Sequence, residues 1–108
     1  MNKLYKILEE PNDKLIAVDL DWTICKGEFW WEWEPEPLMD RIEYFNSLYK
    51  KGAHIIIYTA RDPRWFAVTQ NWLDKHWVMR HWIEMMRKIW ADLYIDDKAI
   101  NINDIKLC

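Results

Sequence analysis

Three short apolar runs, each followed directly by an acid or a threonine, constrain the fold of this chain more than any other feature. The runs and their polar ends are residues 15–18 before Asp19-Leu20-Asp21, residues 54–58 before Thr59, and residues 93–95 before Asp96-Asp97. Continuous apolar runs of this length are typical of strands that are covered on both faces of a parallel sheet. Because ligands bind beyond the carboxyl ends of such strands, the polar residues are candidates for one functional site.

The segments between these runs have helical spacing. Apolar residues recur over residues 38–49 and a helix is expected to stop at Gly52, while Asp62-Pro63 is a helix start followed by an inner face at Trp65, Phe66, Thr69, Trp72 and Leu73. Residues 78–90 are ambiguous, and we expect an edge strand at Val78-Met79 followed by a helix through Lys88. Alternating strands and helices predict an α/β fold, a Rossmann-like three-layer sandwich with a mainly parallel sheet.

The bulk properties narrow the class of protein. A chain of 108 residues is expected to form a single domain, 1–108, and its net charge of −3 gives no basic footprint for nucleic acid. We expect no membrane partner, because no apolar run approaches about 18 residues and the first ten residues are too charged for a signal peptide. Two cysteines make no disulfide framework, which favours a reducing cytoplasm. The oligomeric state stays open between a monomer and a homo-oligomer.

The polar strand ends predict a chemistry. Carboxylates gathered at one sheet edge repel one another unless a cation neutralises them, and Mg²⁺ suits carboxylates with open water positions. Asp19 is then a candidate nucleophile and Asp21 a candidate acid and base, while Thr59 and Lys88 would meet phosphate oxygens. Each residue alone has a simpler interpretation as a turn, cap or solvated side chain. These simpler interpretations would have to hold independently at all three strand ends. A single functional site shared by the three ends is therefore favoured.

This joint pattern resembles the haloacid dehalogenase-like (HAD) hydrolases over about residues 14–100. The matching residues are Asp19, Asp21 and Thr23 for the Asp-x-Asp-x-Thr motif, Thr59 for the second motif, Lys88 for the motif lysine, and Asp96-Asp97 for the acidic pair. Lys98 is the competing choice for the lysine. The resemblance is to small members without a large cap domain, and residues 22–37 would form an active-site loop or flap.

The resemblance implies roles for these residues. Asp19 would be the nucleophile and Asp21 the general acid and base, assisted by Lys88. Magnesium would be held by Asp19, Asp96 and the backbone carbonyl of Asp21, with Asp97 in support. We expect the phosphate-binding groups to be Thr23, Thr59, Ala60 and Arg61.

The expected function is therefore magnesium-dependent hydrolysis of a small phosphorylated metabolite, a sugar phosphate or a nucleotide, through an aspartyl-phosphate. One alternative is a phosphatase for nucleic-acid ends, against which the acidic net charge argues. Another is a non-catalytic phosphate- or metal-binding module of the same fold. The chain also ends soon after its third central strand, so a further helix or strand is left open.

Tryptophan is abnormally frequent, with nine Trp and two Gly, whereas average usage predicts about eight Gly. Trp22 stands where the HAD motif usually has Gly, Trp77 follows a predicted helix end that favours Gly, and Trp90 precedes the third strand. Trp31, Trp33 and Trp82 are in predicted turns, whereas Trp65 and Trp72 fit a helix inner face. Our hypothesis is that UGA codons read as Gly by one genetic code have been translated as Trp by another; the alternative is a naturally Trp-rich chain. If Trp22 is genuine, it disfavours catalysis.

Overall fold

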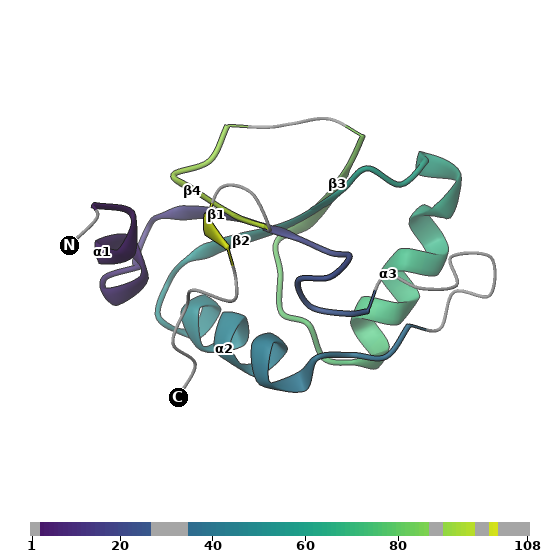
Figure 1. Ribbon diagram of the computed structural model, residues 1–108, viewed down its shortest axis with the longest axis horizontal. Helices are drawn as coiled ribbons and strands as arrows, with labels where there is room; N and C mark the ends of the chain where they lie inside the picture. Colours follow the sequence, from purple (N-terminus) through teal and green to yellow (C-terminus); the bar gives the residue numbers. More distant parts are fainter. Residues whose placement is uncertain (1–2, 27–34, 87–89, 97–99, 102–108) are drawn as a thin grey trace.

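The computed structural model describes residues 3–26, 35–86, 90–96 and 100–101 (Figure 1). Its elements are, in chain order, α1 (Lys3–Glu9), β1 (Leu15–Asp19), α2 (Met39–Lys50), β2 (His54–Thr59), the 3₁₀ helix η2 (Pro63–Trp65), α3 (Phe66–Lys75), β3 (Trp82–Met85), β4 (Leu93–Asp96) and β5 (Ile100–Asn101). The strands form one parallel sheet in the order β3-β2-β1-β4-β5. The three apolar runs are thus its three central strands, as predicted.

One face of the sheet carries the main hydrophobic core. Register places Ile55 and Leu93 on either side of Ile16, and Ile57 and Ile95 on either side of Val18. These two rows pack in one cluster with the inner faces of α2 and α3, which lie on the same side of the sheet (Figure 1). The helix residues are Ile42, Phe45, Leu48, Trp72 and Leu73. Each such buried side chain contributes about 1.5–3 kcal/mol relative to exposure.

The opposite face of the sheet is also shielded from solvent. Ala17 and Ile56, which are register partners pointing away from the main core, are fully buried. Burial on both faces explains why the central strands read as continuous apolar runs rather than alternating ones. The architecture is the predicted α/β, Rossmann-like three-layer fold. Within the described ranges, no helix is long and apolar enough to cross a lipid bilayer.

The region after α3 differs from the prediction. The edge strand is β3 rather than Val78-Met79, so the helix predicted to follow Val78-Met79 through Lys88 is wrong over residues 82–85. Trp82 lies in a strand rather than a turn. Val78 is buried in the main core, and its N–H donates to Leu73 O at the end of α3, so no sheet pairing is needed to explain its apolar side chain.

Helices α2 and α3 end in the same hydrogen-bonded motif with different residues at its centre. After α2, Gly52 N–H donates to Tyr49 O (3.0 Å) and Ala53 N–H to Leu48 O (3.1 Å), with φ 98° at Gly52. After α3, the equivalent bonds run from Trp77 to Asp74 (3.2 Å) and from Val78 to Leu73 (2.9 Å), with φ 58° at Trp77. Both are Schellman motifs, whose central residue is usually glycine because it adopts the left-handed conformation. Position 77 therefore has the backbone of a glycine site.

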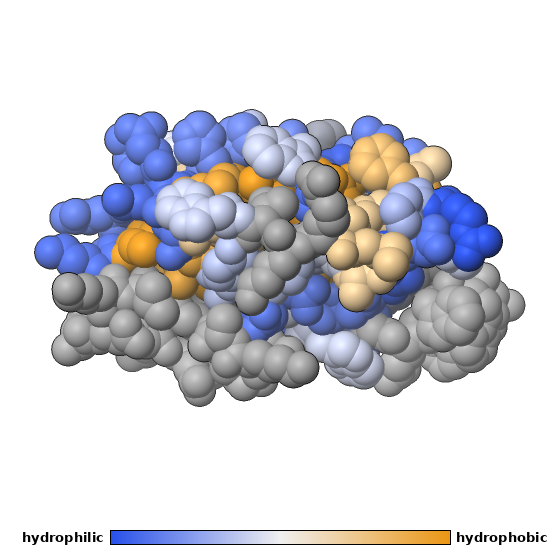
Figure 2. Space-filling model, turned by 90° about the horizontal axis from the view of Figure 1, so that it is seen from above, coloured by the Kyte–Doolittle hydropathy of each residue, from blue (hydrophilic) through white to orange (hydrophobic). Residues whose placement is uncertain are grey.

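The surroundings hold this turn in place. The Asn46 side-chain amide donates to Trp77 O (2.8 Å), and its oxygen accepts from Met79 N–H (2.8 Å). The indole of Trp77 is 79% exposed, so it gains little from packing. Figure 2 shows a face of the molecule on which hydrophilic and hydrophobic residues are intermixed.

Replacing Trp77 by glycine is expected to raise the free energy of unfolding by about 1 kcal/mol. The left-handed conformation costs an L-residue roughly 1–2 kcal/mol, and the greater freedom of glycine in the unfolded chain offsets part of the gain. For a domain of this size the melting temperature should rise by about 4–8 °C, measured by thermal unfolding. Trp82→Gly is the matched control, because Trp82 is also exposed but lies in β3 without positive φ, and this change should destabilise. A Trp77→Gly protein no more stable than wild type would contradict the assignment.

Candidate active site

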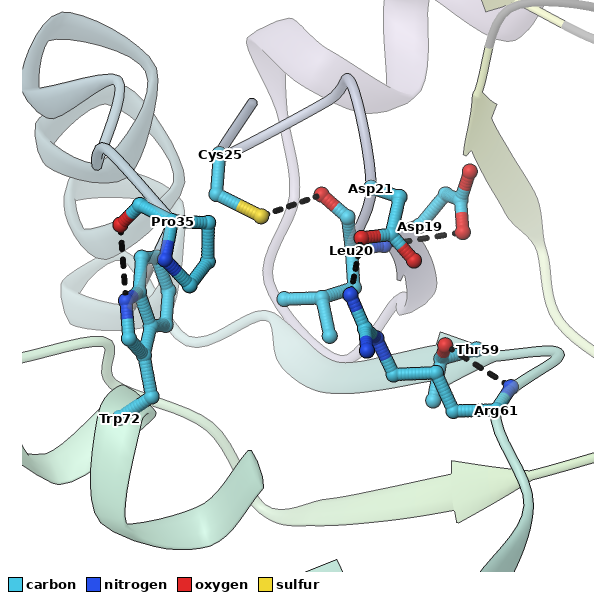
Figure 3. A network of polar contacts seen from close by, with 8 residues as sticks. All are labelled: Asp19, Leu20, Asp21, Cys25, Pro35, Thr59, Arg61 and Trp72. Atoms are coloured by element: carbon cyan, nitrogen blue, oxygen red, sulfur yellow. Dashed lines mark hydrogen bonds and ion pairs between the residues drawn. The ribbon is translucent and has the colours of Figure 1, made fainter. Parts of the chain in front are cut away.

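The polar strand ends meet at the carboxyl edge of the sheet, as the parallel topology requires. Asp19 ends β1, Thr59 ends β2 and Asp96 ends β4, and β1 lies between the other two strands. Asp21 lies two residues after the end of β1, and Arg61 lies two residues after the end of β2 (Figure 3). The structure therefore brings together side chains that are separated by up to 77 positions in the sequence.

A tight turn after β1 presents the two motif acids. Leu20 N–H donates to Asp19 Oδ1 (2.9 Å), and Leu20 O accepts from Thr23 N–H (3.3 Å) and Ile24 N–H (3.1 Å). Leu20, Thr23 and Ile24 are buried beneath this turn, so their side chains anchor it. Thr23 follows the motif acids in the chain and its side chain is buried in the protein interior, so its phosphate-binding role stays a prediction.

Trp22 adopts the left-handed conformation within this turn, with φ 65°. Its N–H donates to Cys25 O (2.7 Å), and its carbonyl accepts from Arg41 Nη1 (3.1 Å). Both backbone polar groups are thus held by other parts of the chain, while the indole is 55% exposed. Positive φ at a bulky residue is an outlier, so position 22 also has the backbone of a glycine site.

Arg61 binds the second motif acid. Its Nη2 lies 2.6 Å from Asp21 Oδ1 in an ion pair, and the Arg61 side chain is only 11% exposed (Figure 3). The Arg61 N–H also donates to Thr59 Oγ1 (3.2 Å), which closes the turn after β2. Ala60, between them, is exposed. The predicted phosphate-binding segment 59–61 therefore places a guanidinium beside the acids.

A tyrosine that the sequence interpretation missed reaches the third strand end. The Tyr58 hydroxyl donates to Asp96 Oδ2 at 2.7 Å. Strand alternation could have indicated Tyr58, because it points to the face opposite Ile57 and is the register partner of Asp19. No motif position marks it, since the recognised motif residue is its neighbour Thr59.

Cys25 lies behind the motif turn and has a structural role. Burial is the largest cause that raises the pKa of its thiol, to about 12; the Asp21 and Asp19 carboxylates add to the increase, and the Arg61 guanidinium opposes it. The thiol is therefore neutral at physiological pH, and Sγ lies 3.6 Å from Leu20 O as a weak donor. Cys25 is not a nucleophile in this environment.

The two ends of the predicted flap, residues 22–37, pair with each other. Lys26 N–H donates to Glu36 O (3.0 Å), and Leu38 N–H to Ile24 O (2.9 Å). Trp72 Nε1 donates to Pro35 O (3.0 Å) and ties this base to α3. The base of the segment is therefore hairpin-like, whereas residues 27–34 lie outside the described residues.

The described carboxylates could supply one or two ligands to a magnesium ion, but not a larger set. Across the described ranges, no group of three or more His, Cys, Asp and Glu side chains is arranged to hold a metal ion. Asp19 and Asp96 end adjacent strands, and Mg²⁺ is commonly held by one or two carboxylates together with waters and substrate phosphate. The predicted site residues Lys88 and Asp97, and the competing Lys98, lie outside the described residues.

Comparisons with known proteins support the fold. No protein-family model and no curated protein matches this chain. A crystal structure of a target protein from Vibrio cholerae is 29% identical, with 84% of this chain and 85% of that chain covered and a TM-score of 0.65. The structure of a conserved protein from Bacteroides thetaiotaomicron is 23% identical, with 88% and 83% covered and a TM-score of 0.68. These two structural similarities support the α/β fold of this chain and indicate no activity.

Proposed function

We propose that this protein is a magnesium-dependent phosphomonoester hydrolase that acts on a small phosphorylated metabolite through an aspartyl-phosphate. The observation that carries the proposal is the meeting of Asp19, Asp21 and Asp96 at one sheet edge, with the Arg61 guanidinium bound to Asp21. Such a site combines a nucleophile, an acid and base, a cation-binding pair and a phosphate partner. These are the components of phosphoryl transfer by a carboxylate.

The residues divide the reaction into two displacements. A carboxylate oxygen of Asp19 attacks phosphorus, the ester P–O bond breaks, and Asp21 donates a proton to the leaving oxygen. Asp21 then takes a proton from water, whose oxygen attacks the phosphorus of the aspartyl-phosphate and releases inorganic phosphate with Asp19 regenerated. Asp19 and Asp96 would hold magnesium, which offsets the negative charge on the phosphoryl group when bound.

Arg61 connects substrate binding to Asp21. The ion pair places the Arg61 guanidinium beside the proposed acid and base. A guanidinium also binds phosphate oxygens through paired N–H donors. A phosphorylated substrate would therefore compete with the Asp21 carboxylate for the Arg61 guanidinium.

A second candidate function is a non-catalytic phosphate- or metal-binding module. The left-handed, exposed Trp22 between Asp21 and Thr23 favours it, because a bulky side chain stands beside both reacting acids. Both candidate functions predict binding of phosphate or a metal ion, and only the hydrolase predicts turnover.

Release of phosphate from a generic aryl phosphate tests the proposal. We expect release by the purified protein in Mg²⁺, its loss after chelation with EDTA, and its return when Mg²⁺ is restored, since charge neutralisation is needed for attack by an anionic nucleophile. Phosphate is measured colorimetrically. Turnover that is unchanged by EDTA would contradict the magnesium assignment. No turnover by either the wild type or Trp22→Gly would contradict the hydrolase and favour the binding module.

A further inference from the structure

The Tyr58 side chain reaches across the end of β1, the strand that ends in the proposed nucleophile Asp19. Its own strand, β2, and the strand of Asp96, β4, are the two neighbours of β1 in the sheet. Tyr58 is the register partner of Asp19, and the β1–β4 register continued by one residue brings Asp96 beside Asp19. The bond from the Tyr58 hydroxyl to Asp96 Oδ2 (2.7 Å) therefore passes over the end of β1.

The three side chains share one face of the sheet. Their neighbours Val18, Ile57 and Ile95 all point into the main core, so alternation directs Asp19, Tyr58 and Asp96 to the other face. The Tyr58 ring packs edge-on against that of Tyr94, with centroids 6.3 Å apart and planes at 87°. This contact and the partial burial of Tyr58 restrict the direction of its hydroxyl.

A hydroxyl in this position fixes the orientation of Asp96 without neutralising it. The terminal torsion of an aspartate is broad, so an outside donor is needed to hold the carboxylate plane in one orientation. A phenol donates a strong bond to a carboxylate but brings no positive charge that would compete with a cation. The remaining acceptor capacity of a carboxylate, which has about four lone-pair sites, is compatible with a metal ligand.

We propose that Tyr58 is a positioning residue that orients Asp96 for a divalent cation held between Asp96 and Asp19. This inference rests on the proposed function, because it takes Asp96 as a magnesium ligand. It adds a residue from β2 to a site whose recognised acids come from β1 and β4. Hydrogen-bond partners of metal ligands typically change metal affinity by about 10–100-fold when they are removed.

The test is a Mg²⁺ titration of Tyr58→Phe, followed by thermal unfolding, because a ligand that binds the native state raises its melting temperature. We expect the Mg²⁺ concentration for half-maximal stabilisation to rise about 10-fold or more relative to wild type. Tyr49→Phe is the matched control. It also removes one phenol hydroxyl, but its ring packs against His81 (4.9 Å), which bonds to Ile55 near the other end of β2. Its midpoint should equal that of wild type.

A double-mutant cycle tests whether Tyr58 affects Mg²⁺ binding through Asp96. In an Asp96→Asn background, adding Tyr58→Phe should leave the Mg²⁺ midpoint unchanged, because the oriented carboxylate is already absent. An unchanged midpoint for Tyr58→Phe alone would overturn the inference, including when the melting temperature without Mg²⁺ falls, since that indicates a purely structural role. A wild-type protein that Mg²⁺ does not stabilise at all would overturn the magnesium site itself, and with it the inference.

Discussion

Replacing Asp19 by asparagine is expected to reduce magnesium-dependent phosphate release by a factor on the order of 10⁴ or more. An amide oxygen is a poor nucleophile toward phosphorus, so the aspartyl-phosphate cannot form. The fold should survive, because the asparagine carbonyl can still accept the Leu20 N–H that now bonds to Asp19 Oδ1 at 2.9 Å. The measurement is phosphate release at saturating Mg²⁺, with thermal unfolding to verify that the variant is folded.

The chain offers a matched control at the other end of the same strand. Asp92 Oδ2 accepts the Leu15 N–H (2.7 Å), so Asp92→Asn makes the same chemical change at a carboxylate that bonds to the backbone of β1. This variant should keep wild-type turnover. Equal rates for Asp19→Asn and wild type would exclude Asp19 as the nucleophile. Equal losses of rate in Asp19→Asn and Asp92→Asn would show that phosphate release depends on the structural integrity of β1 rather than on the Asp19 carboxylate.

The central strands could be predicted because burial on both faces leaves a continuous apolar signature. The edge strand β3 (Trp82–Met85) could not, since it mixes an exposed Trp82 and a half-exposed Glu84 with apolar residues. Val78 and Met79 gave a false strand signal, because Val78 is apolar for a different reason, as the buried residue that closes the Schellman motif. Helix α1 was not predicted, although Leu8 reaches the main core.

The candidate site was predictable in its acids and not in their partners. The spacing of Asp19 and Asp21 after an apolar run identifies them from local sequence. The ion pair between Arg61 and Asp21 joins residues 40 positions apart, and the bond from Tyr58 to Asp96 joins residues 38 apart. Those pairings depend on strand order and register, which a single sequence does not specify.

The tryptophans divide into three groups in the structure. Trp22 and Trp77 have positive φ, as expected for glycine positions. Trp72 is 3% exposed and donates a hydrogen bond to Pro35, so it is an ordinary core residue, as predicted. Trp82 lies in β3 and Trp65 is half-buried at the end of η2, so neither fits its predicted place fully. Positive φ therefore supports the codon hypothesis at two of its six positions, whereas Trp31 and Trp33 lie outside the described residues.

Replacing Trp22 by glycine is expected to raise the rate of magnesium-dependent phosphate release by about 10²-fold, because misplacing reacting groups by about 1 Å costs this much. Two effects contribute. Glycine adopts φ 65° without the strain of a bulky residue, so the turn that carries Asp19 and Asp21 can relax. Glycine also removes an indole from the peptide between Asp21 and Thr23, where a phosphoryl group must enter. Phosphate release at saturating Mg²⁺ measures the gain.

Trp22→Ala separates these two effects. Alanine removes the indole but keeps a Cβ, so φ 65° stays unfavourable while Arg41 and Cys25 continue to hold the backbone of residue 22. We expect the alanine variant to have an intermediate rate and to be about 1 kcal/mol less stable than the glycine variant. The gene sequence is an independent check, in which we expect UGA at codons 22 and 77 and UGG at codon 72. A glycine variant no faster than wild type would assign the low rate to other residues, and UGG at codons 22 and 77 would contradict the codon hypothesis.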